Sequence, residues 1–286
     1  MPKFYFILLL TSLLCSLSRA DVNIVTTIKP LQMIAEAVVQ EYGSVSAIVD
    51  SQQPPHHFTV SPSDRINLAR ADMAVWIGPL FETRISDFFA QARLKAKTIT
   101  VIDTPGLQLH SIGDGRLDAH LWLDSSNAVQ IAKVIAERAA EMDPVNARSY
   151  HQNFEKFSSE IESGNLQIAQ KFQAPSATNY AVYHNAYQYF EKQFGLQHGI
   201  VILQDPEVQP SIRETIALRR QVNDQRPLCL LLEFDSSPDL VDTVLNGHEL
   251  KQITVDLLGS NVNSNRNAYS EFIANIADDF YECLYE

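Results

Sequence analysis

Short apolar runs rich in β-branched residues alternate with longer amphipathic stretches along the first half of the chain. The apolar runs end at turn signals and predict strands. Stretches such as 30–43, with Pro30 at the start and Gly43 at the end, predict helices. Alternation of strand and helix indicates a parallel sheet that helices cover on both faces. The predicted strands are 23–28, 44–50, 73–78 and 98–103.

The same alternation returns in the second half of the chain, without a sequence repeat in matching register. The predicted fold class is therefore α/β, with two parallel-sheet (β/α)4 lobes. The second lobe is predicted to have strands at 180–184, 198–204, 228–234 and 250–256, and helices at 186–195, 211–224, 237–247 and 268–286.

One long helical pattern lies between the two halves. Asp143 and Pro144 are typical of a helix cap and first turn. The stretch 143–173 predicts one stiff helix of about 28 residues, roughly 40 Å long, that joins lobes at 21–142 and 174–286. Gly164 inside it would permit a bend or a close contact. The apolar stripe of this helix is predicted to contain Tyr150, Phe154, Phe157, Ile161, Ile168 and Phe172.

The first segment, 1–20, has a basic start, an apolar run over 4–14 and small residues up to Ala20, which is typical of a secretory signal peptide. The run is too short to span a bilayer. A lipid anchor at Cys15 is disfavoured, because the bulky Leu14 stands where a small residue is expected. We therefore expect an exported protein, which would be periplasmic in a Gram-negative host.

Export leaves an acidic chain. The leader takes away two of the 22 basic residues and none of the 34 acidic ones, so the net charge falls from −12 to −14. Such a surface repels phosphate backbones, and we expect no nucleic-acid partner.

Export also leaves two cysteines, Cys229 and Cys283, in an oxidising compartment. They form either a disulfide, which would stabilise the fold by roughly 4 kcal/mol, or two buried free thiols. A cysteine-based zinc site needs more thiols than these two.

The eight histidines divide by setting. His56 and His57 stand behind two prolines and after a predicted strand, His120 precedes a helix, His184 ends a strand, and Asp256 ends the last strand. Side chains that follow parallel strands face one ligand-binding edge. Imidazoles with a carboxylate suit tetrahedral zinc, whereas manganese prefers more carboxylate oxygen. Capping or packing is the alternative role for each histidine. We assign such ordinary roles to His110, His151, His198 and His248.

Several segments resemble, in the same order, the zinc-binding solute receptors of bacterial ABC transporters, a branch often called ZnuA-like. PPHHFTVSPSD followed by ADMAVWIGP is similar to the P-H-x-[YF]-x-x-x-P-S-D segment and the sequence after it in that family. DAHLWLD, YHNAYQYFEKQFGL, VQPSIRETIALRRQV and DLLGSNV continue the match. The resemblance covers essentially all of 21–286.

The resemblance implies a set of metal ligands. The ligand histidine of the first motif falls on His56, and the second and third ligands fall on His120 and His184. Manganese receptors of the family tend to have glutamate at the place of His184, so the match favours Zn²⁺. Asp256 matches the aspartate of the family, which binds directly or stands beside a completing water. His57, where the family commonly has an acidic residue, is a bystander or an alternative ligand.

The resemblance also implies a disulfide between Cys229 and Cys283, two lobes joined by a rigid helix, and transfer of captured zinc to a membrane permease of the ABC type. We expect a monomer that is not an enzyme. Three segments depart from the family besides His57. HSIGDGRLDAH has few histidines where zinc receptors often carry a metal-rich loop, and LEFDSS and DLLG replace AEPQF and DPLG. The last two changes put the fourth ligand in doubt.

Three other functions compete with a zinc receptor. A manganese or iron receptor of the same fold would differ in metal preference. A zinc hydrolase would need a general base, and Glu233 is the one candidate, with no H-E-x-x-H motif present. An adhesin with this fold would leave no distinct signal in the sequence.

Overall fold

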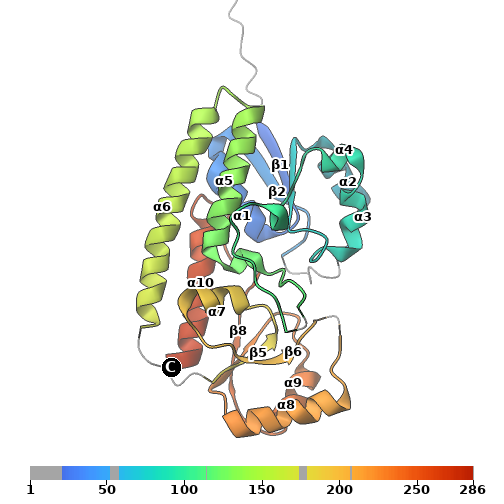
Figure 1. The fold of residues 1–286 in the computed structure, drawn as a ribbon, viewed down its shortest axis with the longest axis vertical. Coiled ribbons are helices and arrows are strands. Elements are labelled where there is room, and N and C mark those ends of the chain that lie inside the picture. The colour runs from blue at the N-terminus through green and yellow to red at the C-terminus, as the bar shows by residue number, and fades with distance from the viewer. Residues whose placement is uncertain (1–20, 52–57, 114, 174–178, 207, 286) are drawn as a thin grey trace, which may run out of the picture.

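The computed structural model describes residues 21–51, 58–113, 115–173, 179–206 and 208–285. It contains two four-stranded parallel sheets, one in each half of the chain, with the strand orders β2-β1-β3-β4 and β6-β5-β7-β8. In each sheet the first strand of the lobe lies between the second and the third. The predicted fold class of two α/β lobes is confirmed (Figure 1).

The N-terminal sheet begins with a strand that pairs on both sides, with Val22 opposite Gly43 and Ile24 opposite Met73. Its last strand is shorter than the prediction 98–103, because the chain turns into a 3-10 helix over Val101–Asp103. The strands are β1 (Val22–Thr26), β2 (Gly43–Ala47), β3 (Met73–Trp76) and β4 (Thr98–Thr100), and the helices are α1 (Lys29–Val39), α2 (Pro62–Arg70), α3 (Ser86–Phe89), α4 (Ala92–Lys95) and α5 (Ser125–Met142).

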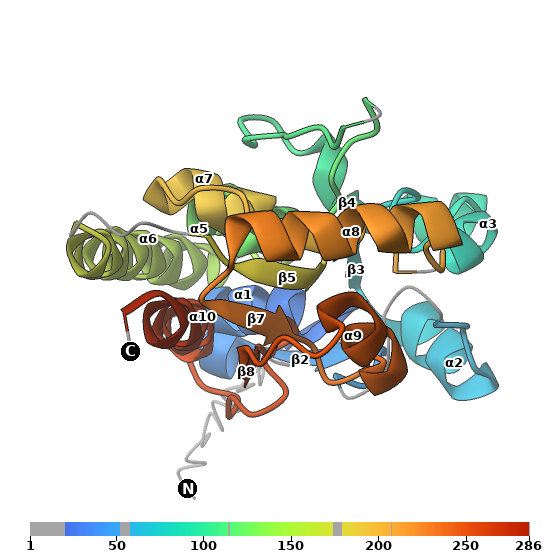
Figure 2. The same ribbon diagram turned by 90° about the horizontal axis from the view of Figure 1, so that it is seen from below.

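Helices α8 and α9 pack together on one face of the C-terminal sheet, the face nearest the viewer in Figure 2, and α7 and α10 pack on the other face. Glycine or asparagine in the left-handed conformation ends two of these helices, at Gly195 and Asn246. The strands are β5 (Ala181–His184), β6 (Ile200–Leu203), β7 (Cys229–Leu232) and β8 (Lys251–Thr254), and the helices are α7 (Gln188–Phe194), α8 (Ile212–Gln225), α9 (Pro238–Leu245) and α10 (Ala268–Tyr285).

The connecting helix α6 spans Ala147–Lys171 and runs along both lobes (Figure 1). Its start differs from the prediction. Asp143 caps the end of α5 instead, and its carboxylate accepts hydrogen bonds from Asn146 Nδ2 at 2.7 Å and Tyr150 Oη at 2.9 Å. Of the two roles expected for Gly164, a bend or a close contact, the close contact is wrong, since a Cβ there would meet nothing within 4 Å. The lobe limits 21–142 and 174–286 remain predictions.

One continuous apolar core joins the lobes. It contains residues from α1 and β1 of the first lobe and from β5, β7 and α10 of the second. The helix α10 packs against α1 and α6 as well as against β7 and β8. The predicted stripe of α6 contributes Tyr150, Phe157, Ile161 and Ile168 to this core, with Phe154 and Phe172 partly buried beside it. This shared core restricts how far the lobes can move apart.

Candidate metal centre

A cavity of about 290 Å³ lies between the lobes and contains His120 and His184. Aromatic side chains line it from both lobes, with Phe81 and Trp122 from the first and Tyr183 from the second. Both histidines are only 8% exposed. From the sequence we expected a cleft of this kind at the carboxyl ends of the strands.

The sheet of the second lobe positions His184. It is the last residue of β5 and pairs with Leu203 of β6, while β7 pairs with the earlier part of the same strand, up to Val182. Its Nδ1 atom lies 3.2 Å from Oε2 of the buried Glu233, which follows β7. That oxygen makes no well-aligned hydrogen bond, so the contact is electrostatic. Burial alone would lower the pKa of His184, but the charge of Glu233 outweighs burial and raises the pKa.

A short turn positions His120. Its Nδ1 lies 2.8 Å from Oδ1 of Asp118, which also accepts the backbone N–H of His120 at 3.0 Å. Burial alone would raise the pKa of Asp118. Its hydrogen bonds with His120 and with the Gln188 side chain outweigh burial and hold the pKa below the ordinary value.

The two imidazoles face each other through their other nitrogens, with Nε2 of His120 3.3 Å from Nε2 of His184. Two nitrogens that each lie 2.0–2.1 Å from a tetrahedral ion are about 3.3–3.4 Å apart. In both rings Nδ1 faces a carboxylate, which leaves the Nε2 lone pair for a metal. The arrangement therefore matches two corners of a tetrahedral site.

A family model described as zinc-uptake complex component A, periplasmic, matches residues 24–283. The chain belongs to this family. A high-affinity zinc uptake system protein ZnuA from Brucella abortus is 26% identical over 312 aligned positions, which cover 94% of this chain and 93% of that protein. Membership confirms the resemblance found in the sequence and the prediction of a zinc receptor for ABC-type uptake.

Solved structures share the fold. A crystal structure of ZnuA has a TM-score of 0.79 at 23% identity, covering 92% of this chain and 99% of the other. The periplasmic zinc-binding protein TroA from Treponema pallidum has a TM-score of 0.81 at 18% identity, covering 93% and 100%. Zinc-uptake family proteins are receptors of the periplasm, and in the described part of this chain no helix is long and apolar enough to cross a membrane.

Of the remaining predicted ligands, Asp256 alone lies within the described residues, and its side chain is held by its own loop. The Asp256 carboxylate accepts hydrogen bonds from its own loop: from Leu258 N at 3.2 Å, Ser260 Oγ at 2.7 Å and Asn261 N at 3.0 Å. His56 and His57 lie outside the described residues. Among the residues that are described, no group of three or more His, Cys, Asp or Glu side chains could hold a metal ion.

The other predicted features have clear places. Cys229 in β7 and Cys283 in α10 form a disulfide, with their Cα atoms 5.5 Å apart. His198 Nδ1 lies 2.5 Å from Oε2 of Glu191. The His110 ring packs against the Tyr189 ring, with 4.8 Å between the ring centroids. These two histidines have the ordinary roles expected of them.

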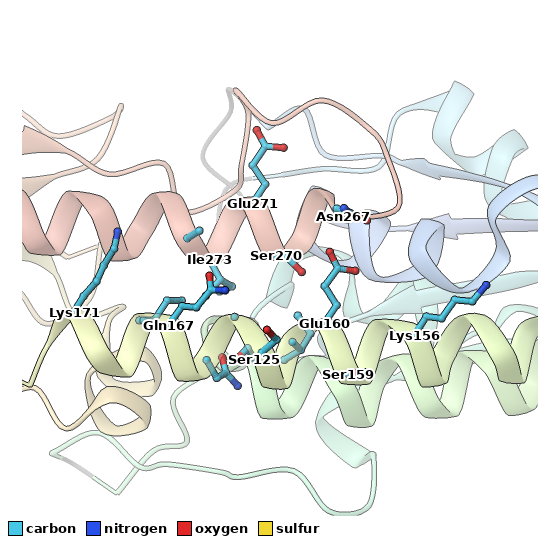
Figure 3. Close-up of a pocket in the computed structure, with 16 residues that line it drawn as sticks. Ser125, Lys156, Ser159, Glu160, Gln167, Lys171, Asn267, Ser270, Glu271 and Ile273 are labelled. Carbon is cyan, nitrogen blue, oxygen red and sulfur yellow. Dashed lines mark hydrogen bonds between the residues drawn. The ribbon is translucent and has the colours of Figure 1, made fainter.

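A larger groove, with a volume of about 820 Å³, lies elsewhere, between α6 and α10 (Figure 3). Polar side chains such as Lys156, Glu160 and Gln167 point into it, and Gly164 and Ser270 line it. None of the described residues that line it is a histidine or a cysteine. The interlobe cavity, which holds two facing imidazoles, is the better candidate for a metal site.

Sequence reasoning missed Asp118 and left Glu233 as a possible base. The signal for Asp118 was its place two residues before a ligand candidate, in the segment DAH. Glu233 faces His184 Nδ1, and its Oε1 accepts a hydrogen bond from Tyr187 Oη at 2.7 Å. Both carboxylates therefore support histidines.

Proposed function

We propose that the protein captures Zn²⁺ with Nε2 of His120 and Nε2 of His184, completes the site with His56, and delivers the metal to an ABC-type permease. The Nε2–Nε2 distance of 3.3 Å carries the proposal, because it matches two corners of a zinc tetrahedron. His57, Asp256 or a water molecule supplies the fourth corner. We further propose that the leader directs export, that the mature chain begins at Asp21, and that the protein is a monomer.

The chemistry of the pair favours zinc over manganese. Both ligands are imidazoles, and their supporting carboxylates face the Nδ1 atoms and not the metal side. This also argues against a hydrolase, since Glu233 is held by His184 and Tyr187. Acid should release the metal, because a protonated imidazole cannot bind it.

Calorimetric titration of the metal-stripped protein with zinc and with manganese tests the proposal. We expect one tight zinc site, and a loss of at least about a thousandfold in affinity, roughly 4 kcal/mol, in each of His56→Ala, His120→Ala and His184→Ala. The exposed His151 on α6 provides the control His151→Ala, which should bind zinc like the parent. Tighter manganese binding, zinc retained at pH 4, or indifference to the three substitutions would contradict the proposal.

A further inference from the structure

The segment that carries His120 precedes α6 in the chain, yet side chains from the C-terminal lobe hold it. Residues 110–113 and 115–118, linked by an antiparallel bridge between Ser111 and Leu117, form the two arms of a hairpin that projects from the body of the molecule (Figure 2). The second arm ends at Asp118 and leads directly to His120. The helix α7, which follows His184 closely, lies against the base of this hairpin and the start of α5.

Tyr189 of α7 joins the two sides of the hairpin base. Its hydroxyl donates to the carbonyl of Asp118 at 2.8 Å and accepts the backbone N–H of His110 at 3.2 Å. Its ring is fully buried and packs against the ring of His110. One hydroxyl therefore fixes the backbone two residues before His120.

Gln188, the first residue of α7, acts on the side chain of Asp118. Its Nε2 donates to Oδ2 of Asp118 at 3.2 Å, while Oδ1 of the same carboxylate faces His120 Nδ1 at 2.8 Å. The carboxylate thus lies between an amide of the second lobe and the ring of a first-lobe ligand. Its rotation, and with it the plane of the His120 ring, depends on both contacts.

Further contacts from the second lobe hold the residues after His120. Trp122 Nε1 donates to the carbonyl of Leu257 at 3.0 Å, and the Tyr269 hydroxyl of α10 donates to the carbonyl of Trp122 at 2.7 Å. Gln193 of α7 accepts the backbone N–H of Ser125 at 3.0 Å. From the first lobe, the ring of Phe81 packs edge-on against the ring of His120, with 5.8 Å between the two ring centroids.

We propose that Gln188 and Tyr189 are positioning residues of the metal site, which fasten His120 to the C-terminal lobe so that His120 and His184 form one preassembled half-site. The inference rests on the proposed function, since it assumes that both histidines bind the metal. A half-site assembled before metal arrives avoids the entropy cost of ordering two ligands from separate lobes. Loss of a supporting partner of a ligand typically costs about 10–100-fold in metal affinity.

The test compares Gln188→Met and Tyr189→Phe with a matched control. Tyr180→Phe removes the hydroxyl of another fully buried tyrosine, whose one O–H points between two acceptors near the far end of α7, Glu191 Oε1 at 2.5 Å and the Gln197 carbonyl oxygen at 2.7 Å. Zinc affinity is measured by competition with a chelator, and Co²⁺ absorption reports the coordination geometry. Hydrogen exchange of the metal-free protein follows residues 118–123, and chemical unfolding reports stability.

We expect Gln188→Met and Tyr189→Phe each to weaken zinc binding about tenfold, to change the Co²⁺ spectrum, and to speed exchange over 118–123. Tyr180→Phe should lower stability but leave affinity and spectrum unchanged. Parental affinity and spectrum in the two α7 variants, or affinity losses that Tyr180→Phe shares, would overturn the inference. Unchanged zinc affinity in His120→Ala would overturn the proposed function, and this inference with it.

Discussion

The two lobes have the same strand order but support their histidines in different ways. His184 ends a strand that pairs on both sides, and its partner Glu233 follows the neighbouring strand of the same sheet. His120 lies in a turn between β4 and α5, beside Asp118 of the same turn. The second lobe fixes its own histidine, whereas the histidine of the first lobe is held by side chains of α7 and α10 of the second.

This difference indicates that the second lobe is the platform of the site. In a parallel sheet the ladder fixes the direction of each strand-end side chain. A turn has no such ladder and needs side-chain contacts to fix it. The bridging contacts from the second lobe supply them, so the geometry of the pair depends on the second lobe more than on the first.

The disulfide offers the largest test of the platform. It fastens β7, next to β5, to α10, and it closes a sequence separation of 54 residues. Replacing both cysteines by serine should lower the free energy of unfolding by roughly 4 kcal/mol, measured by chemical denaturation. Zinc affinity of the folded fraction should change little, since neither cysteine lines the interlobe cavity. Denaturation of the parent with and without a reductant is the control, and equal stability of the two would contradict the prediction.

The supporting carboxylates test the contrast directly. Asp118→Asn and Glu233→Gln should both weaken zinc binding, within the range of about 10–100-fold typical of such partners. We expect the larger loss for Asp118→Asn, because the strand ladder still holds His184 when Glu233 changes. Competition with a chelator measures both affinities. A larger loss in Glu233→Gln would show that the second lobe is no better a platform than the first.

The sequence predicted the fold better than the site. Alternating strands and helices are local patterns, so both sheets and the stripe on α6 could be found from spacing alone. The position of His184 at a strand end was also a local fact. The contact between His184 and Glu233 joins the ends of two strands, and the hydrogen bond from Tyr189 to Asp118 joins residues 71 positions apart in the sequence. Neither contact leaves a local signal in the sequence. The direction of the Asp256 side chain depends on hydrogen bonds within its loop, which spacing does not specify.

One carboxyl with a raised pKa in each lobe, the half-buried Asp279 and the buried Glu82, gives the smallest expected effect. Burial, together with the charges of Glu282, Asp278 and Asp256, raises the pKa of Asp279 on α10 to about 7. Between the ordinary value of 3.8 and about 7, the folded state keeps a proton that the unfolded state has lost, so stability falls as the pH rises. Asp279→Asn should therefore stabilise the protein at pH 8 and change little at pH 4, as chemical denaturation at both pH values can show.

Glu82 in the first lobe sharpens this comparison. Burial raises its pKa to about 7 as well, but its carboxylate accepts hydrogen bonds from Thr27 Oγ1 at 2.5 Å and from the backbone N–H of Gly78 at 2.8 Å. A glutamine side chain has only one acceptor oxygen and cannot accept all of these hydrogen bonds. Glu82→Gln should therefore destabilise the protein at pH 8, where Asp279→Asn stabilises it. A gain in stability at pH 8 from Glu82→Gln would mean that the charge of this carboxyl outweighs its hydrogen bonds. The charge of Glu82 would then destabilise the folded protein at pH 8, as we expect for the charge of Asp279 on α10.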